Sequence, residues 1–129
     1  MNTPHNASRK HTVALTSAAN QTGTAYSPYI TGFIETIQYV KTDYADGVDF
    51  TITAEATGET IWTEANVNAA VIKHPRAATH TTLGAAALYA AAGTAVTDRI
   101  AVGADRVKIV LAQAGATKSG SFVITVSDR

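Results

Sequence analysis

Apolar and polar residues alternate along several stretches of the chain, and such alternation is typical of β-strands that bury one face. The clearest stretch is residues 48–55, whose inward positions are Val48, Phe50, Ile52 and Ala54. Shorter stretches with the same pattern cover residues 11–15, 61–64, 96–102, 107–111 and 122–126. The pattern predicts about eight short strands, with turns at roughly the 8–12-residue spacing of a sandwich or barrel.

Two further stretches are β-prone but irregular. Residues 33–41 form a long expected strand whose alternation breaks near residues 34–37, so we expect a bulge there or burial on both faces. Residues 26–30 are the second stretch. Pro28 places them at the edge of a sheet, because proline cannot donate a backbone hydrogen bond to a neighbouring strand.

Turn residues suggest which strands pair. Asp46-Gly47 and Thr57-Gly58-Glu59 predict hairpin turns, and together they predict a three-stranded meander over residues 33–64. The glycine-containing loop at residues 113–120 predicts a terminal hairpin between the last two strands. We therefore expect an all-β fold, a single-domain β-sandwich over residues 11–129 that is arranged as a jelly roll.

Two segments lack the alternating pattern. Residues 1–10 show no periodicity, and their composition predicts a flexible N-terminal arm. Residues 65–93 are rich in alanine, which favours one short helix between Gly84 and Gly93. Their low charge and β-prone neighbours favour a buried crossover loop instead. Neither segment is needed to complete the alternating core, so we expect both to be interaction elements.

The amino-acid composition of the chain argues against several classes of binding partner. Ten basic and ten acidic residues balance, which argues against nucleic acid, and the absence of cysteine excludes disulfides and thiolate nucleophiles. No apolar run approaches the ~20 residues of a membrane helix. The polar start of the chain does not resemble a secretory signal. We therefore expect no nucleic acid, no membrane and no export.

Candidate metal ligands are few. His74 and His80 lie on either side of Pro75, which spoils any helical spacing, so we interpret both as ordinary loop histidines. One loop gathers three carboxylates, Asp43, Asp46 and Asp49. Their spacing does not match a calcium-binding EF-hand, and turn formation explains them better. The sequence predicts no metal site and no bound cofactor.

Catalytic and sugar-binding candidates are equally sparse. Carboxylate pairs of the glycosidase kind could in principle come from Glu55, Glu59 and Glu64, but these residues flank a turn, and we interpret them as solvated turn carboxylates. Sugars stack on exposed rings, and the chain offers Trp62 with the tyrosines Tyr26, Tyr29, Tyr39, Tyr44 and Tyr89. The expected strand around Trp62 favours core packing for its ring. No nucleophile elbow or phosphate loop occurs. We predict no catalytic residues and no enzyme activity.

Four stretches resemble small structural proteins of tailed bacteriophages. They are residues 31–41 (TGFIETIQYVK), 45–53 (ADGVDFTIT), 57–62 (TGETIW) and 106–115 (RVKIVLAQAG). The resembling proteins are similar to capsid decoration or cement proteins, which are often jelly rolls that oligomerise on the outer shell and bridge capsomers. The resemblance carries no catalytic motif.

The resemblance implies a function and partners. It implies a virion protein that is made in the host cytoplasm, sits on the capsid surface, binds the major capsid protein and forms a homo-oligomer, a dimer or a trimer. Two alternatives stay open. One is a neck, tail or spike-associated component of the virion, and the other is a carbohydrate-binding adhesion module.

Overall fold

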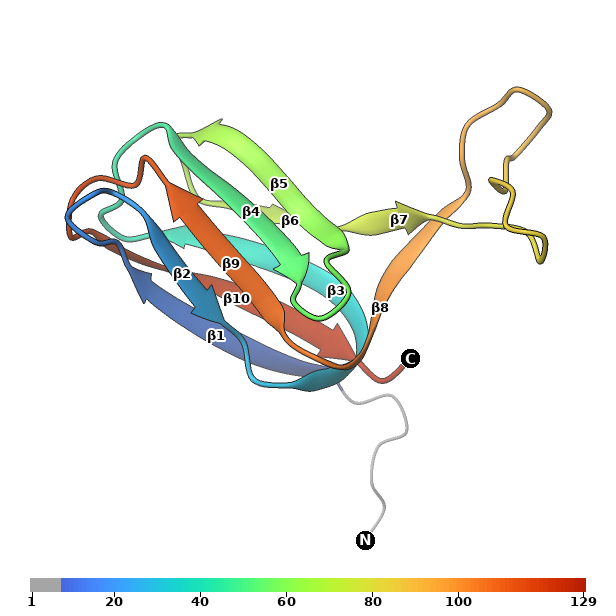
Figure 1. Cartoon of the computed structure of the whole chain (residues 1–129), viewed down its shortest axis with the longest axis horizontal. Coiled ribbons are helices and arrows are strands. Elements are labelled where there is room, and N and C mark those ends of the chain that lie inside the picture. Colours follow the sequence, from blue (N-terminus) through green and yellow to red (C-terminus); the bar gives the residue numbers. More distant parts are fainter. Residues whose placement is uncertain (1–7) are drawn as a thin grey trace, which may run out of the picture.

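The computed structural model describes residues 8–129 of the chain. The protein is a single-domain β-sandwich of two antiparallel sheets, as the alternating pattern predicted (Figure 1). The strands within the described residues are β1 (Ser8–Thr16), β2 (Gly23–Tyr26), β3 (Ile30–Lys41), β4 (Val48–Ala54), β5 (Thr60–Val67), β6 (Val71–Lys73), β7 (Arg76–Ala78), β8 (Thr97–Asp105), β9 (Val107–Ala112) and β10 (Ser119–Ser127).

The strands pair in a nested order. The larger sheet runs β1-β10-β3-β8-β7, with β6 also paired to β3, and the smaller sheet runs β2-β9-β4-β5. Thus β1 pairs with β10, β2 with β9, β3 with β8, and β4 with β5. This nesting is consistent with the expected jelly roll, to which β6 and β7 would be additions. The assignment as a jelly roll stays a prediction.

The core lies between the sheets and is built from the inward positions of the alternating strands. All four inward residues of the stretch 48–55 are buried, as predicted. Phe50 lies at the centre of an aromatic cluster. Its ring centroid is 5.2 Å from those of Tyr39 and Phe122, and 4.7 Å from that of Trp62. Burial of these large side chains is a major source of stability for the sandwich.

Two of the expected hairpins are wrong, because the strands that flank them belong to different sheets. β3 lies in the larger sheet and β4 in the smaller one, so residues 33–64 do not form a meander. β9 and β10 also lie in opposite sheets, so residues 113–120 cross the sandwich instead of closing a terminal hairpin. The turn at residues 57–59 does join paired strands, β4 and β5. Alternation indicates which face of a strand is buried, but not which strand lies beside it.

Two strand boundaries also differ from expectation. β2 ends at Tyr26 and β3 begins at Ile30, so residues 27–29 link the two sheets and the strand expected at 26–30 is wrong. β1 begins at Ser8, which pairs with Ser127, so residues 8–10 of the expected arm belong to the larger sheet. Backbone pairing with β10 holds these polar residues in place without an alternating pattern. The rest of the arm, residues 1–7, lies outside the described residues.

The break in alternation within β3 is a β-bulge, as expected. Ile34 pairs with Val126 and Thr36 pairs with Thr125, which leaves Glu35 as an extra residue without a partner in the register. The bulge allows Ile34 and Ile37 both to face the core. It also leaves Glu35 partly exposed on the outer side of the sheet.

Residues 76–99 project from the sandwich as a β-hairpin, named the finger below; the rest of the described chain is the body (Figure 1). The base of the finger is β7 paired with the start of β8, and Ala78 is the partner of Thr97. Its tip, residues 79–96, contains only isolated bridges, and residues 8–129 contain no helix. Both expectations for the alanine-rich segment, a helix and a buried loop, are therefore wrong. A helix of about two turns is unstable without packing, and the tip packs on no part of the core.

Candidate functional site

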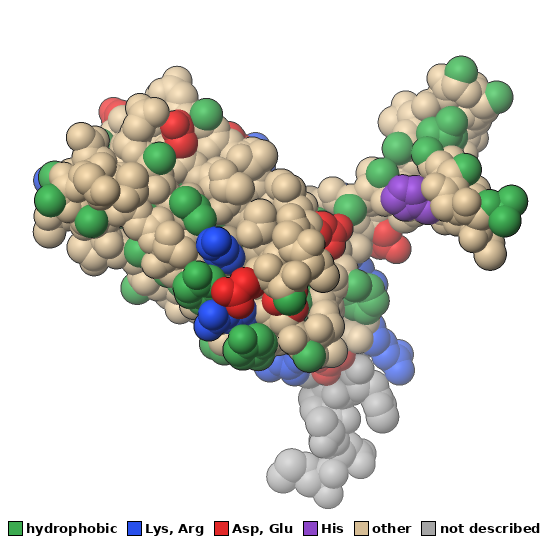
Figure 2. All heavy atoms as spheres, in the orientation of Figure 1, with side chains coloured by type: hydrophobic (Ala, Val, Ile, Leu, Met, Phe, Trp, Pro, Cys, Tyr) green, Lys and Arg blue, Asp and Glu red, His purple; other side chains and the backbone are tan. Residues whose placement is uncertain are grey.

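The tip of the finger exposes apolar side chains and carries no Asp, Glu, Lys or Arg. Between Arg76 and Asp98 the sequence contains no Asp, Glu, Lys or Arg. Leu83, Tyr89 and Leu88 lie in this stretch with 96%, 74% and 42% of their surface exposed. On the face shown in Figure 2, the tip carries green side chains and no red or blue ones. Exposed apolar side chains that gather on one projecting segment make the tip a candidate interaction site.

Backbone hydrogen bonds within the finger give the tip a defined shape. The Thr79 N–H donates to the Val96 carbonyl at 2.8 Å, and the Ala87 N–H donates to the Thr79 carbonyl at 3.0 Å. The Tyr89 N–H donates to the Thr94 carbonyl, also at 3.0 Å. These bonds satisfy backbone groups that a projecting loop would otherwise leave to water. The apolar side chains of the tip are therefore held outwards on an ordered frame.

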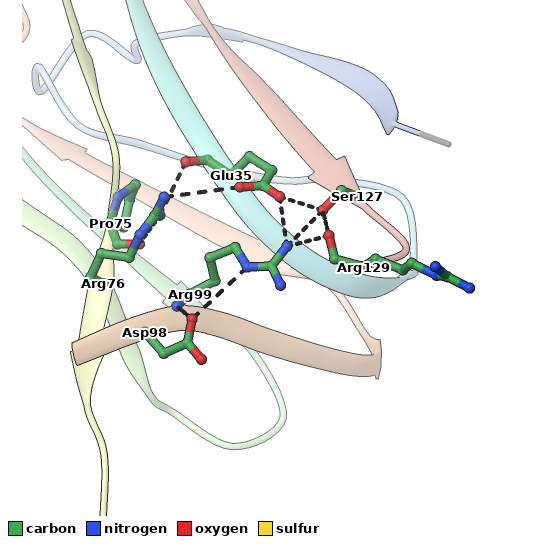
Figure 3. Close-up of polar contacts among 7 residues, drawn as sticks. All are labelled: Glu35, Pro75, Arg76, Asp98, Arg99, Ser127 and Arg129. Atoms are coloured by element: carbon green, nitrogen blue, oxygen red, sulfur yellow. Dashed lines mark hydrogen bonds and ion pairs between the residues drawn. The ribbon is translucent and has the colours of Figure 1, made fainter. Parts of the chain in front are cut away.

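A polar cluster at the root ties the finger to the body (Figure 3). The Oε2 atom of Glu35, on the bulge of β3, accepts hydrogen bonds from Arg99 Nη1 at 2.8 Å and from Ser127 Oγ at 2.5 Å. Arg99 belongs to the finger. Its guanidinium also lies 4.4 Å from the centroid of the Phe33 ring, and its Nη1 atom donates a hydrogen bond to the Arg129 carbonyl. Because these contacts connect finger and body, they set the direction in which the finger points.

Arg76 fastens the other strand of the finger to the same bulge. Its Nη1 atom donates to the Glu35 backbone carbonyl at 3.2 Å, and its Nη2 atom lies 3.9 Å from Glu35 Oε1. Both strands of the base thus contact Glu35. The side chains are partly exposed, so the ion pairs contribute more to orientation than to overall stability.

Replacing Glu35 with glutamine is expected to lower the free energy of unfolding by about 1–2 kcal/mol at neutral pH. The Ser127 hydroxyl, and after it Arg99, holds the pKa of Glu35 below its usual value of 4.5. A carboxylate whose pKa falls on folding stabilises the protein above its unfolded pKa, and this stabilisation disappears as the pH falls through the folded pKa. Urea denaturation from neutral to acidic pH should therefore show the two proteins converging below pH 4.5.

Glu59→Gln is the matched control for this measurement, because Glu59 is exposed in the turn between β4 and β5. That variant should match the parent protein at every pH. If the Glu35→Gln deficit were as large in acid as at neutral pH, the effect would lie in packing, and the proposed role of the charge would be wrong.

A second polar cluster surrounds Arg106, between β8 and β9. Its guanidinium lies 4.0 Å from the centroid of the Tyr26 ring and 5.3 Å from that of the Tyr29 ring. Glu55 accepts from Arg106 Nε at 2.7 Å and from Nη2 at 3.1 Å, which lowers the pKa of Glu55 and raises that of Arg106. The cluster is a partly exposed aromatic patch whose two charges already bind each other.

Trp62 packs in the core, as the strand pattern predicted. Only 8% of its surface is exposed, and its ring meets that of Phe50 edge to face. The indole Nε1 donates to Glu64 Oε1 at 3.1 Å. Its ring therefore offers no exposed face on which a sugar could stack.

The five tyrosines do not share one surface. Tyr39 and Tyr44 are buried and stacked on each other, with ring centroids 6.1 Å apart. Tyr26 and Tyr29 flank Arg106, whereas Tyr89 lies on the finger. The structure therefore divides the aromatic residues among the core, the Arg106 cluster and the finger.

The carboxylates and histidines considered for chemistry have separate surroundings. Glu55 pairs with Arg106, Glu64 binds the Trp62 indole, and Glu59 is exposed in a turn. The three loop aspartates have different partners: Asp43 accepts from the Ser119 N–H at 2.5 Å, Asp46 pairs with Lys41, and Asp49 accepts from the Asn66 N–H at 2.8 Å. His74 lies between β6 and β7, and His80 lies on the finger. Residues 8–129 contain no group of three such side chains that could hold a metal ion.

The polar cluster of Glu35, Arg76, Arg99 and Ser127 at the root of the finger was not predicted from the sequence. One signal was available, because the break in alternation at residues 34–37 indicates a bulge, and bulges often re-aim a side chain. The arginines gave no signal, since an arginine within a strand pattern normally faces solvent. Their convergence on Glu35 depends on β7 and β8 lying beside β3.

No protein-family model matches the chain, and no curated protein is significantly similar to it. Within the part of the chain that the structure describes, no helix is long and apolar enough to cross a lipid bilayer. The structural features that can suggest a function are the finger, the polar cluster around Glu35 at its root, and the Arg106 cluster.

Proposed function

We propose that this chain is a structural protein of a bacteriophage virion, a capsid decoration or cement protein that binds the major capsid protein lattice and stabilises the head. It acts by binding and not by catalysis, and its copies associate as a homo-oligomer on the capsid surface. The observation that carries the proposal is the finger, an ordered projection from a β-sandwich whose tip is apolar and carries no Asp, Glu, Lys or Arg. The sequence resemblance to small structural proteins of bacteriophages is the reason for proposing a phage capsid as the particle to which the chain binds.

Decoration depends on many weak contacts that act together. A subunit that binds one capsomer and is also linked to a neighbour gains apparent affinity of about 10²–10⁴-fold through avidity. A body with a well-packed core can seat on a lattice, while a projection from it reaches a neighbouring molecule. The finger has the exposure and the fixed direction that such a link requires.

Removing the tip of the finger should reduce occupancy on phage particles. Because Ala78 and Thr97 are register partners, residues 79–96 can be replaced by Asn-Gly, which closes a two-residue hairpin. We expect the body to stay folded and the apparent affinity for capsids to fall by about 10²-fold or more. Cryo-electron microscopy of particles, with quantification of bound chain by mass spectrometry, measures the occupancy.

A variant of another turn serves as the control. Exchanging Thr57-Gly58-Glu59 for Asn-Gly shortens the β4–β5 connection and leaves the finger intact, so occupancy should be unchanged. Density for the chain on the capsid lattice supports the proposal. Density confined to the neck, tail or spike, or absence of the chain from particles, would refute decoration.

A further inference from the structure

We infer that the finger packs against the finger of a second copy of this chain to form a two-fold dimer. The inference rests on the proposed function in one respect, that the finger is a contact element. It adds that the partner of the finger is a second copy of the chain. Four features support it: the size of the finger, its lack of charge, the polar groups at its root and its direction.

The size of the finger is close to that of one side of a stable interface. Standard protein interfaces involve about 20–30 residues on each partner, and the finger spans residues 76–99. Only the facing side of each hairpin would be buried, so two fingers that lie side by side can supply a large part of such an interface. The apolar tip would form its centre, where Leu83, Leu88 and Tyr89 are available for burial.

Charge favours a copy of the same surface as the partner. A two-fold interface brings a surface patch against the same patch of the other subunit, so a patch with net charge repels itself. The finger has no charged side chain between Arg76 and Asp98 and avoids this cost. The other exposed aromatic patch of the described body is built around the Arg106–Glu55 pair, whose charges a covering partner would have to desolvate.

The root of the finger supplies the polar rim that surrounds the apolar centre of most interfaces. Arg76, Asp98 and Arg99 bring both signs of charge to the base, and the Asp98 side chain is 71% exposed. The bonds from Arg99 and Arg76 to Glu35 hold the finger away from the body, beyond the edge of the sandwich (Figure 1). Two fingers can therefore meet while the two bodies stay apart and free to seat on a lattice.

Opposite charges placed at one position of the finger test this contact. Leu83 is almost wholly exposed, so Leu83→Glu and Leu83→Lys should leave the body folded. Sedimentation of the purified chain up to roughly 100 μM covers the micromolar end of affinities for standard interfaces. We expect the parent protein to be a dimer and each variant alone to be monomeric. An equimolar mixture of the two variants at low ionic strength should recover dimers, and added salt should dissociate them.

Val110→Glu is the matched control, because it places the same charge on an exposed aliphatic side chain of the body, and it should stay dimeric. A parent protein that is monomeric throughout, or a Leu83→Glu variant that still dimerises, would overturn the inference. So would a mixture that stays monomeric, since the finger would then meet a different surface. These results concern the free chain, whereas the proposed function fails separately if the chain is absent from the capsid lattice.

Discussion

Replacing Gly120 with alanine is expected to destabilise the protein by about 3 kcal/mol or more, because the added methyl group would overlap a buried ring. A Cβ atom at position 120 would lie 2.6 Å from Cδ2 and 2.8 Å from Cζ of Tyr44. The ring has little room to retreat, since its hydroxyl donates to the Leu15 carbonyl and its face stacks on buried Tyr39. Chemical denaturation of the parent and the variant measures the loss.

Gly103→Ala is the control for this substitution. Gly103 also lies in a strand, β8, but a Cβ atom there would meet no atom within 4 Å. Its effect should be within about 0.5 kcal/mol, as for an ordinary surface change. If Gly120→Ala were as mild as Gly103→Ala, Tyr44 would be free to move, and the close packing inferred at this site would be wrong.

Truncating Phe50 to alanine is expected to cost about 3–5 kcal/mol of unfolding free energy, as for other buried phenylalanines. Phe50 is 2% exposed, and its ring contacts those of Tyr39, Trp62 and Phe122, which come from both sheets. The variant leaves a cavity at the point where the two sheets meet. Urea denaturation followed by Trp62 fluorescence reports both the stability and the local change.

Phe50→Leu separates the cavity from the loss of the aromatic ring. Leucine keeps most of the volume and the burial, so we expect it to retain much of the stability that alanine loses. Equal losses for the two variants would contradict a cavity as the main cause. They would assign the effect to the edge-to-face contacts with Trp62 and Phe122 instead.

Most strands of the body could be predicted because they carry their own local signal, whereas β2 and β6 were not predicted with these bounds. In β4, β9 and β10 the inward positions are apolar and buried, and the outward positions are more exposed. The same logic located the bulge in β3, where two inward isoleucines break the period of two. Each of these features depends on a few consecutive residues, so the amino-acid order is enough to identify them.

The finger could not be predicted, because nothing local distinguishes it from a short helix or a covered loop. Alanine has the highest helix propensity of the amino acids, but propensity is a weak determinant of structure, and a short helix needs packing against a neighbour to persist. The segment has no such neighbour, since it leaves the body where β8 parts from β3 and pairs with β7. The convergence of Arg76 and Arg99 on Glu35 depends on the same branching of the sheet.

Amino-acid order thus established an all-β chain, the buried face of most strands, and the absence of charge in residues 77–97. Strand partners depended on three dimensions: β3 and β4 are consecutive yet lie in opposite sheets, while β1 pairs with β10 at the far end of the chain. Local alternation is the same whichever neighbour a strand has, so partners are chosen by the packing of the whole core. That packing also leaves the uncharged segment outside the sandwich, where it becomes an exposed contact surface and not part of the core.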